Sequence, residues 1–304
     1  MAKSINFELR NPHLSTPTLF QYDLQYKKTF SCRTSFCMKT FIQMYTDIVT
    51  KVKVFYEHLN LHKLEKHTGR KLSIPIVETI ALSLFKNANG IPTKKAVWNI
   101  FRPNCSYKTL SENMKRYYLL AVYIFTMIMR INRRSAHAIK RTDTTDIPVC
   151  LNKNAKHHKT MAGLAAWGHS GKGMFYGLKM GLTDDLFSTI LNIVFAPGNT
   201  DDRVLFRKLN KDLRGIFVTD AGFISEKLAR EFFIENERML FTKPRANMKK
   251  IATPFQRLLY DTRTRIECHF RELKLFYGLQ SSVPRSVDGY FANYVYALLA
   301  YVCA

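Results

Sequence analysis

The spacing of apolar and polar positions divides the chain into a helical first part and a mixed second part. From about residue 41 to residue 131, apolar residues recur at helical spacing. After about Ser135 the period changes, and stretches that alternate between apolar and polar residues appear among helical ones. We therefore expect an α/β protein whose first part is all helical.

A helix–turn–helix outline lies within the first part. The apolar stretch Ile74–Lys86 follows Ser73, a good N-cap, and Asn87–Gly90 is typical of a helix end and turn. Thr93 is then expected to cap a short basic helix, Lys94–Phe101. Two packed helices without a DNA-reading role fit the same pattern, and because no base-reading residue can be identified, that interpretation is slightly favoured.

The second part begins with a predicted hairpin. Residues Met174 to Leu182 alternate with period two, which indicates a strand, and Thr183–Asp185 are expected to form the turn. Leu186–Ala196 is the predicted second strand, and Pro197–Asn199 would end it.

Helices and short strands are expected after the hairpin. Thr200 is the predicted N-cap of a helix with two aspartates in its first turn. Ser225 is the predicted N-cap of the helix Glu226–Ile234. Short strands are predicted at Gly215–Asp220 and Met239–Thr242, and long helices at about 253–277 and 287–303. These elements imply a mixed sheet with helices packed on it. The expected organisation is a loose extension over residues 1–36, a helical region over 37–135 that binds DNA, and a catalytic region over 136–304.

Charge points to nucleic acid as the partner. Lys and Arg total 47 against 23 acidic residues, a formal net charge of +24. Such an excess is usually neutralised by a polyanion, so nucleic acid is favoured over an anionic membrane surface or a merely basic soluble protein. The apolar runs 117–129 and 289–304 are shorter than the ~18–20 residues of a membrane span. Residues 1–30 show no secretion signal, and the six scattered cysteines fit reduced thiols in a cytoplasmic protein.

Four functional side chains share one edge of the helix predicted at 253–277. On an ideal helix Tyr260, Arg263, Glu267 and Lys274 fall within an arc of about 60°, beside an apolar packing face. This arrangement fits a catalytic edge, but it also fits a solvated face on which Arg263 and Glu267 form an ordinary ion pair.

Three aspartates are further candidates. Asp220 ends a predicted buried strand, where ligands commonly bind in α/β sheets, although an aspartate there can also be a simple turn former. Asp143 and Asp146 lie in a segment that suits a strand entering the sheet. Because residues three apart in a strand face opposite ways, only one of the two is expected to face the site. We expect it to be Asp143, with regular pairing weakening just before Pro148.

The residues of this edge resemble a known signature. Tyr260, Arg263, Glu267 and Lys274 fit the pattern Tyr-x2-Arg-x3-Glu-x6-Lys of a large group of DDE insertion-sequence transposases, whose Glu is the third catalytic carboxylate. Further blocks occur in the family's order: Asp143–Cys150, Phe175–Lys179, Pro197–Arg203, Asp220–Ser225 and Arg265–Glu267. From residue 143 onward, the chain resembles the bacterial insertion-sequence family numbered nine-eighty-two.

The resemblance implies a ribonuclease-H-like catalytic domain. Asp143 would lie on its first strand, Asp220 after its fourth and Glu267 on a late helix. These three carboxylates would be the catalytic residues and would bind two Mg²⁺ or Mn²⁺ ions, which prefer oxygen ligands. Water would attack first and release a 3′-hydroxyl at the element end, which would then attack target DNA. Arg263 and Lys274 would clamp phosphates, and Tyr260 would contact the DNA backbone or a stacked base.

The expected partners follow from this chemistry. They are double-stranded DNA, as element ends and target, and further copies of the chain assembled on DNA in the nucleoid. No membrane and no small-molecule substrate are expected. Two alternatives stay open at this point: a DNA-binding remnant that cannot cut, and a metal-dependent nuclease without strand transfer.

Overall fold

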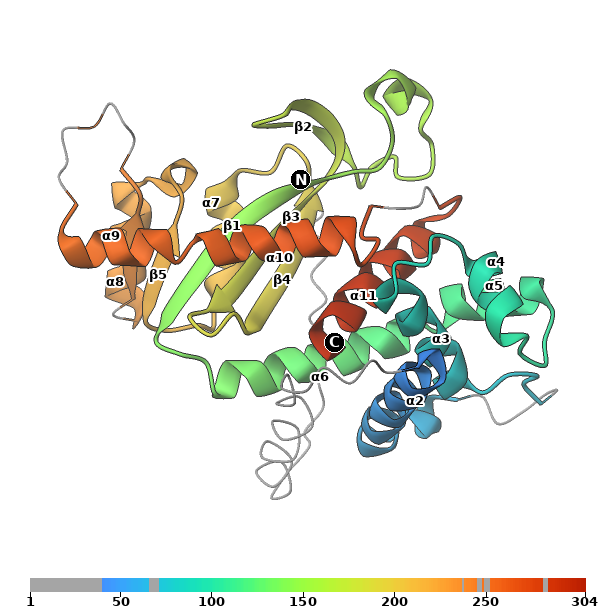
Figure 1. Cartoon of the computed structure of the whole chain (residues 1–304). Helices are drawn as coiled ribbons and strands as arrows, with labels where there is room; N and C mark the ends of the chain where they lie inside the picture. Colours follow the sequence, from blue (N-terminus) through green and yellow to red (C-terminus); the bar gives the residue numbers. More distant parts are fainter. Residues whose placement is uncertain (1–39, 66–70, 237, 245–247, 249–251, 281–283) are drawn as a thin grey trace. The chain divides into compact units, whose positions relative to one another are not determined.

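The computed structural model describes residues 40–304 except 66–70, 237, 245–247, 249–251 and 281–283 (Figure 1). The extension expected over residues 1–36 lies outside the described residues. The chain divides into two compact units: a sheet unit, described over residues 129–272, and a helical unit, described over residues 40–128 and 273–304. Residues 273–304 are thus counted with the helical unit, whereas the sequence grouped them with the catalytic region.

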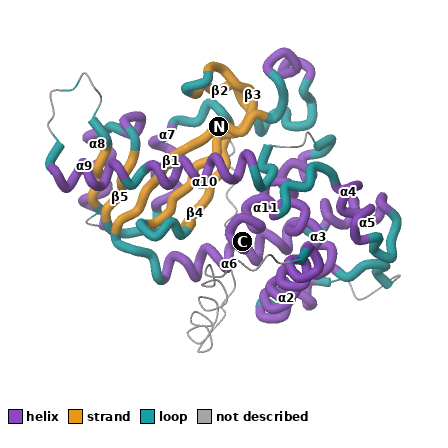
Figure 2. The backbone as a smooth tube through the Cα atoms, in the orientation of Figure 1, coloured by secondary structure: helices purple, strands orange, loops and turns teal. Residues whose placement is uncertain are grey.

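Helices make up the helical unit (Figure 2). They are α2 (Phe41–His58), the short η1 (Leu61–Leu64), α3 (Ile76–Ala88), α4 (Lys94–Phe101), α5 (Tyr107–Arg116), most of α6 (Tyr118–Arg134) and α11 (Val287–Cys303), with the last residues of α10 (Thr264–Leu275). Thr93 caps α4 as predicted, since its hydroxyl accepts a hydrogen bond from Ala96 N at 3.1 Å. The predicted start of α3 was wrong: Pro75, not Ser73, occupies its N-cap position.

The centre of the helical unit is α3, most of whose residues are buried. Leu82 packs with Val97, Leu110 and Met114 in one apolar cluster. Helix α11 packs against α3 and α5, and Tyr296 on α11 donates a hydrogen bond to the Met114 carbonyl oxygen at 3.1 Å.

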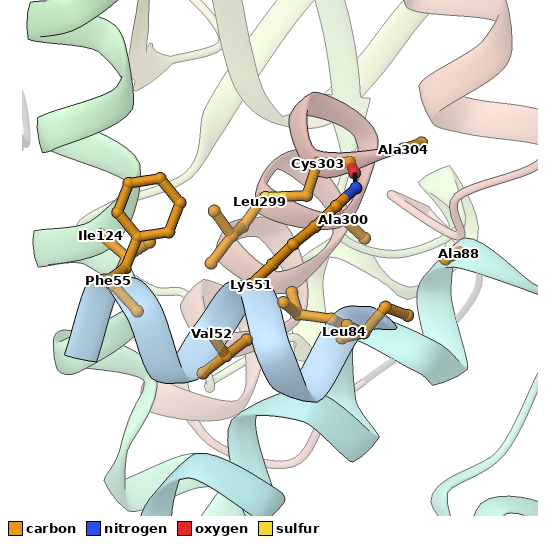
Figure 3. A pocket seen from close by; sticks show the side chains of 11 residues that line it. Lys51, Val52, Phe55, Leu84, Ala88, Ile124, Leu299, Ala300, Cys303 and Ala304 are labelled. Carbon is orange, nitrogen blue, oxygen red and sulfur yellow. Dashed lines mark hydrogen bonds between the residues drawn. The ribbon is translucent and has the colours of Figure 1, made fainter. Parts of the chain in front are cut away.

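The C-terminal end of α11 is capped from α2. Lys51 extends past Leu299 and Ala300 and donates to the Cys303 carbonyl oxygen at 2.6 Å (Figure 3). The last carbonyl groups of a helix have no intrahelical donor, and a lysine satisfies them and complements the helix dipole. A small apolar cavity of about 40 Å³ remains beside the Lys51 stem.

The sheet unit is built on a mixed sheet. Its elements are β1 (Ile139–Pro148), η2 (Asn152–His157), β2 (Ala166–Ser170), β3 (Gly173–Asp185), β4 (Ile190–Pro197), α7 (Asp202–Asn210), β5 (Ile216–Thr219), η3 (Ala221–Phe223), α8 (Glu226–Asn236), β6 (Met239–Thr242), α9 (Pro254–Asp261) and most of α10. The strand order is β2-β3-β1-β5-β6, and β4 also pairs with β3. The pairs that involve β3 are antiparallel, whereas β1, β5 and β6 are parallel.

Helices cover both faces of this sheet. On one face α7 and α8 share an aromatic core with β5, in which Phe206, Phe217 and Phe232 contact one another. On the other face lie α9 and α10, which cross in front of the strands in Figure 1. The chain can pass close to β1 at the start of β5 because Gly215, with φ +104°, has no side chain; a Cβ there would lie 2.3 Å from the Ala138 carbonyl oxygen.

Most of the predicted strands are confirmed, with corrections to their ends. The β3–β4 hairpin and the strand Met239–Thr242 are present as expected. Thr183–Asp185, predicted as a turn, form the end of β3, and the turn follows them. The N-cap of α7 is Asp201 rather than Thr200. An unpredicted strand, β2, makes Asp220 follow the fifth strand in chain order instead of the fourth.

Three further observations concern the cysteines, one basic segment and membrane-spanning helices. The described cysteines Cys105, Cys150, Cys268 and Cys303 are free and half-buried, while Cys32 and Cys37 lie outside the described residues. The basic segment 153–159 is largely exposed. Among the helices of the described part, none is long and apolar enough to cross a membrane.

Candidate active site

Two aspartates lie at the carboxyl ends of neighbouring parallel strands. Strand β1 pairs with β5 through Arg141 opposite Val218, and Asp143 and Asp220 each follow this pair by two residues. Side chains two residues apart in a strand share a face, so both carboxylates are directed to the face covered by α9 and α10. The lower regularity expected near Pro148 was wrong: β1 stays paired with β3 up to Pro148 opposite Gly177.

Asp146 lies on the other side of the sheet. It is three residues from Asp143 and shares a face with Thr144, whose hydroxyl donates to Asp202 Oδ1 at 2.9 Å on the α7 side. The alternation expected from the sequence therefore separates the two rival aspartates, and it is Asp143 that faces α9 and α10.

The predicted continuous helix over 253–277 is broken at Thr262 and Arg263. The helix tightens there to hydrogen bonds between residues three apart: Thr262 N donates to Leu259 O and Arg263 N to Tyr260 O, both at 3.2 Å. The Thr262 hydroxyl also donates to Leu259 O at 2.6 Å, and the Thr262 carbonyl oxygen accepts from Arg141 Nη1 at 3.0 Å. The single arc of four side chains is therefore not present, because Tyr260 lies on α9, Arg263 in the break and Glu267 on α10.

Arg263 lies among three carboxylates that come from three different elements. Its Nη2 atom is 2.9 Å from Asp143 Oδ2 and 4.0 Å from Glu267 Oε1, and its Nη1 atom is 3.2 Å from Asp220 Oδ1. The Arg263 side chain is 10% exposed and that of Asp143 17%, whereas Asp220 is 50% and Glu267 63% exposed. The three acids predicted from the sequence thus converge on one cation.

Burial controls the acidity of Asp143. Removal from water raises the pKa of this carboxyl to about 6, while the Arg263 guanidinium and the hydrogen bond from Thr144 N oppose the rise. The nearby carboxylate of Asp220 raises it further. Asp143 is therefore the most desolvated of the three acids and the one that depends most on a neighbouring cation.

A buried network that the sequence did not reveal holds the break in place. Arg141 Nε and Nη2 bind the two carboxylate oxygens of Asp184 at 2.9 and 2.5 Å, and both side chains are almost completely buried. His269 Nε2 lies 3.1 Å from Asp184 Oδ2. Because Arg141 also binds the Thr262 carbonyl oxygen, one guanidinium connects β1, β3 and the residue before Arg263.

The sequence pattern did not predict this network: it indicated a turn at Thr183–Asp185 and linked neither Arg141 nor His269 to Asp184. The available signal was weak: two adjacent aspartates, Asp184 and Asp185, at the end of an otherwise apolar strand pattern.

Comparison with known families matches this part of the chain. A family model described as a transposase DDE domain matches residues 133–287, which is about half of the 304 residues. The chain belongs to the transposase DDE-domain family. No curated protein matches the chain significantly.

The matched segment of this DDE transposase contains the six residues that the sequence assigned to the site, but the structure does not give all six the same surroundings. Tyr260 donates its hydroxyl to the Thr242 carbonyl oxygen at 3.0 Å, so it ties α9 to the end of β6. Lys274 lies in the last turn of α10 and is counted with the helical unit. Asp143, Asp220, Arg263 and Glu267 are the four that meet.

The donor chemistry of the transposase site fits hard divalent cations. The three convergent acids offer only carboxylate oxygens, which Mg²⁺ and Mn²⁺ prefer. As these side chains stand, no three Asp, Glu, His or Cys groups in the described part of the chain lie close enough together to hold a metal ion. Arg263 lies between the acids, so a metal ion and this guanidinium would compete for the same oxygens.

Proposed function

We propose that the chain is a metal-dependent transposase that cuts DNA at the ends of its element and joins those ends to target DNA. One observation carries the proposal: Asp143, Asp220 and Glu267, from β1, the end of β5 and α10, converge on one buried guanidinium within the matched domain. Ion pairing to a single cation brings together carboxylates that would otherwise repel one another.

The fold proposed for the catalytic unit is ribonuclease-H-like. Antiparallel pairs among β1 to β4, followed in the chain by β5 and β6, which run parallel to β1, and helices on both faces of the sheet support this assignment. Membership of the insertion-sequence family nine-eighty-two belongs to the same proposal and rests on the order of the sequence blocks.

In the proposed mechanism, Asp143, Asp220 and Glu267 hold two Mg²⁺ or Mn²⁺ ions. Such ions, when bound, polarise the attacking and leaving oxygens of an in-line displacement at phosphorus. Asp143 is held by β1 and by Thr144 N, so its position is fixed by the sheet. Glu267 and Asp220 are more exposed and can adjust to a DNA strand that enters from solvent.

Arg263 has two proposed roles. In the metal-free protein its positive charge offsets part of the negative charge of the three carboxylates, as the ion pairs indicate. Once cations compete for these oxygens, the guanidinium is available to bind a DNA phosphate in a bidentate manner. Lys274 is proposed as a second phosphate ligand. The expected partners are double-stranded DNA and further copies of the chain, in the cytoplasm at the nucleoid.

The test is cleavage of DNA that carries the inverted repeats expected to flank the coding sequence. Mg²⁺ or Mn²⁺ should support end cleavage, Ca²⁺ should support binding without turnover, and excess EDTA should abolish cleavage. Asp220→Asn and Glu267→Gln should be inactive, while Asp212→Asn, which removes an exposed carboxylate elsewhere in the sheet unit, should cleave like the wild type. Full activity in EDTA would rule out the proposed chemistry.

Strand transfer needs an assay of its own. Incubation of pre-cleaved ends with a supercoiled target plasmid should give joined products. Cleavage without any joined product would favour the nuclease alternative, and DNA binding without cleavage would favour an inactive remnant.

A further inference from the structure

A cluster of cations lines a pocket in the helical unit. The pocket has a volume of about 420 Å³ and lies among α3, α4, α5 and the start of α11. Its lining includes Lys86, Lys94, Lys115 and Arg285. Among the described residues that line it there is no aspartate or glutamate. Four cations around one hollow without an acidic partner in its wall are typical of a site for an anion.

Among the described residues, the hydrogen-bond partners seen for Lys86 and Lys94 are neutral. Lys86, 7% exposed, donates to Asn87 Oδ1 at 3.0 Å, and Lys94 donates to the Ser111 carbonyl oxygen at 3.4 Å. A buried ammonium group without a counter-ion is costly, so such groups are generally found paired or bound to a ligand. Glu112, beside the pocket, pairs with Lys115 at 2.9 Å and also acts electrostatically on Lys94. Among the described residues, no ion pair with an acidic group is seen for Lys86, Lys94 or Arg285.

The electrostatics of the lysines agree with this geometry. Burial lowers the pKa of Lys86, and burial together with Lys115 and Lys86 lowers the pKa of Lys94 to about 8; Glu112 opposes that change. The pocket therefore holds positive charges that repel one another, and a bound anion would relieve this repulsion.

The N-terminal turns of two helices also line the pocket. Thr93 and Lys94 begin α4, and Ser286 and Gly289 belong to the start of α11. Helix N-termini present N–H groups and a positive dipole end, which favour phosphate. Thr93 Oγ1 and Ser286 Oγ accept hydrogen bonds from helix N–H groups, so each hydroxyl keeps its hydrogen to donate.

We propose that this pocket binds a phosphate group of the DNA backbone and so fixes DNA on the helical unit. The volume exceeds that of a lone phosphate and falls within the ~300–1,000 Å³ of small-ligand pockets, so a phosphate with its attached sugar fits. The pocket lies at the N-terminus of α4, the second helix of the α3–turn–α4 outline, and helix N-termini are common phosphate contacts in such motifs. The choice of DNA over a free phosphate compound rests on the proposed function.

The first experiment tests the anion site without DNA. Thermal unfolding of the full chain is followed in inorganic phosphate, in pyrophosphate and in chloride at equal ionic strength. Phosphate and pyrophosphate should raise the melting temperature of the wild type but not that of Lys86→Met, which replaces the buried ammonium with an apolar group of similar length. Lys53→Met is the matched control, because Lys53 is an exposed cation on α2; this variant should respond like the wild type.

The second experiment tests DNA as the ligand and is done in EDTA, so that cleavage plays no part. Duplex affinity is measured between 50 and 200 mM salt. Lys86→Met and Arg285→Gln should each weaken binding about tenfold or more at low salt and reduce the slope of log affinity against log salt by about one. Lys53→Met should leave that slope unchanged. Arg285 is exposed at the pocket, so its variant tests the site without disturbing the buried core.

The outcomes separate the alternatives. Loss of the phosphate effect together with the reduced salt slope supports the proposal. A phosphate effect that depends on Lys86 but unchanged DNA binding would show that the pocket takes a free phosphate compound, and would overturn the DNA assignment. The site itself would be overturned if Lys86→Met behaves like Lys53→Met in both experiments and Arg285→Gln behaves like Lys53→Met in the second. A chain that fails to cleave DNA but shows both effects would refute the proposed catalysis and leave the pocket assignment standing.

Discussion

The ion pairs of Arg263 lead to a quantitative prediction for the metal-free protein. In Arg263→Gln, three carboxylates lose the cation on which they converge. Removing one partner of a buried pair costs ~3–5 kcal/mol, because a desolvated charge remains. Only Asp143 is substantially buried, and ion pairs to exposed groups such as Asp220 and Glu267 contribute little.

The exposure of Asp220 and Glu267 and the surroundings of the Arg263 Nε atom set the expected loss of unfolding free energy at the low end of that range. The Arg263 Nε atom is buried and has no hydrogen-bond partner among the described residues, so its removal relieves a small cost. We therefore expect a loss of about 3 kcal/mol in the free energy of unfolding. For a unit of this size each kcal/mol shifts the melting temperature by ~2–4 °C, which predicts a decrease of roughly 6–12 °C in EDTA.

Metal ions should reverse much of this loss. In the wild type a divalent cation must compete with the guanidinium, whereas in Arg263→Gln it would meet carboxylates without a counter-ion. Saturating Mg²⁺ or Ca²⁺ should therefore raise the melting temperature of the variant more than that of the wild type. Differential scanning calorimetry in EDTA and in each metal measures both effects.

Arg207→Gln is the matched control. Arg207 forms a similar ion pair with Glu231 at 2.5 Å, but their side chains are 44% and 35% exposed. The free energy of unfolding of this variant should therefore stay within about 1 kcal/mol of that of the wild type. The reasoning is refuted if Arg263→Gln melts with Arg207→Gln in EDTA, or if metal stabilises the wild type and Arg263→Gln equally.

Further predictions concern catalysis, DNA binding and pH. Asp143→Asn should abolish end cleavage but keep DNA affinity, whereas Asp146→Asn, on the other face of the sheet, should keep most activity; a dead Asp146→Asn beside an active Asp143→Asn would reverse the assignment. With a footprint of ~6–10 phosphates, DNA affinity should fall by ~10³–10⁵ between 50 and 200 mM salt, and a flat titration would contradict a polyanion partner. Burial lowers the pKa of Lys94 to about 8 in the folded chain, so the unfolded chain binds more protons between about pH 8 and pH 10. The free energy of unfolding should therefore rise with pH over that window. DNA affinity should fall over the same window, because Lys94 loses its positive charge. Lys94→Met should flatten both pH profiles; unchanged profiles in this variant would show that another group titrates.

Local signals were sufficient for several elements. Two elements have the predicted bounds. The helix Lys94–Phe101 begins after a capping threonine, and the strand Met239–Thr242 is a short apolar run between polar stretches. Neither signal depends on a distant partner. Strand alternation placed Asp143 and Asp146 on opposite faces of the sheet, but it did not by itself decide which of the two faces the site.

Elements that depend on distant contacts could not be predicted in the same way. Thr183–Asp185 has turn-forming residues, but pairing with β1 and the buried ion pair of Asp184 with Arg141 keep it in β3. Asp184 and Arg141 are 43 positions apart, so no local pattern links them. The same arginine binds the Thr262 carbonyl oxygen at the break between α9 and α10, where apolar spacing suggested one continuous helix.

The place of Arg263 in the site was equally hidden from sequence reasoning. Helical spacing put it beside Glu267, which the structure bears out as a pair at 4.0 Å. Its closest partner is Asp143, 120 positions earlier, and this contact exists only once the sheet and the break between the helices have formed. Periodicity therefore placed Arg263 beside Glu267 but could not show that the arginine also contacts Asp143 and Asp220.

The long spacing within the site has a consequence for protein synthesis. Arg263 lies 120 positions after Asp143, so at ~5–20 residues per second a ribosome makes it roughly 6–24 s later. During that interval the nascent chain has its first carboxylate but neither Glu267 nor the cation that neutralises the group. Helix α11, which packs against α3 in the helical unit, is made later still. A chain whose translation stops before residue 263 thus has neither a complete helical unit nor a third carboxylate, so a frameshift or stop codon before that position removes both at once.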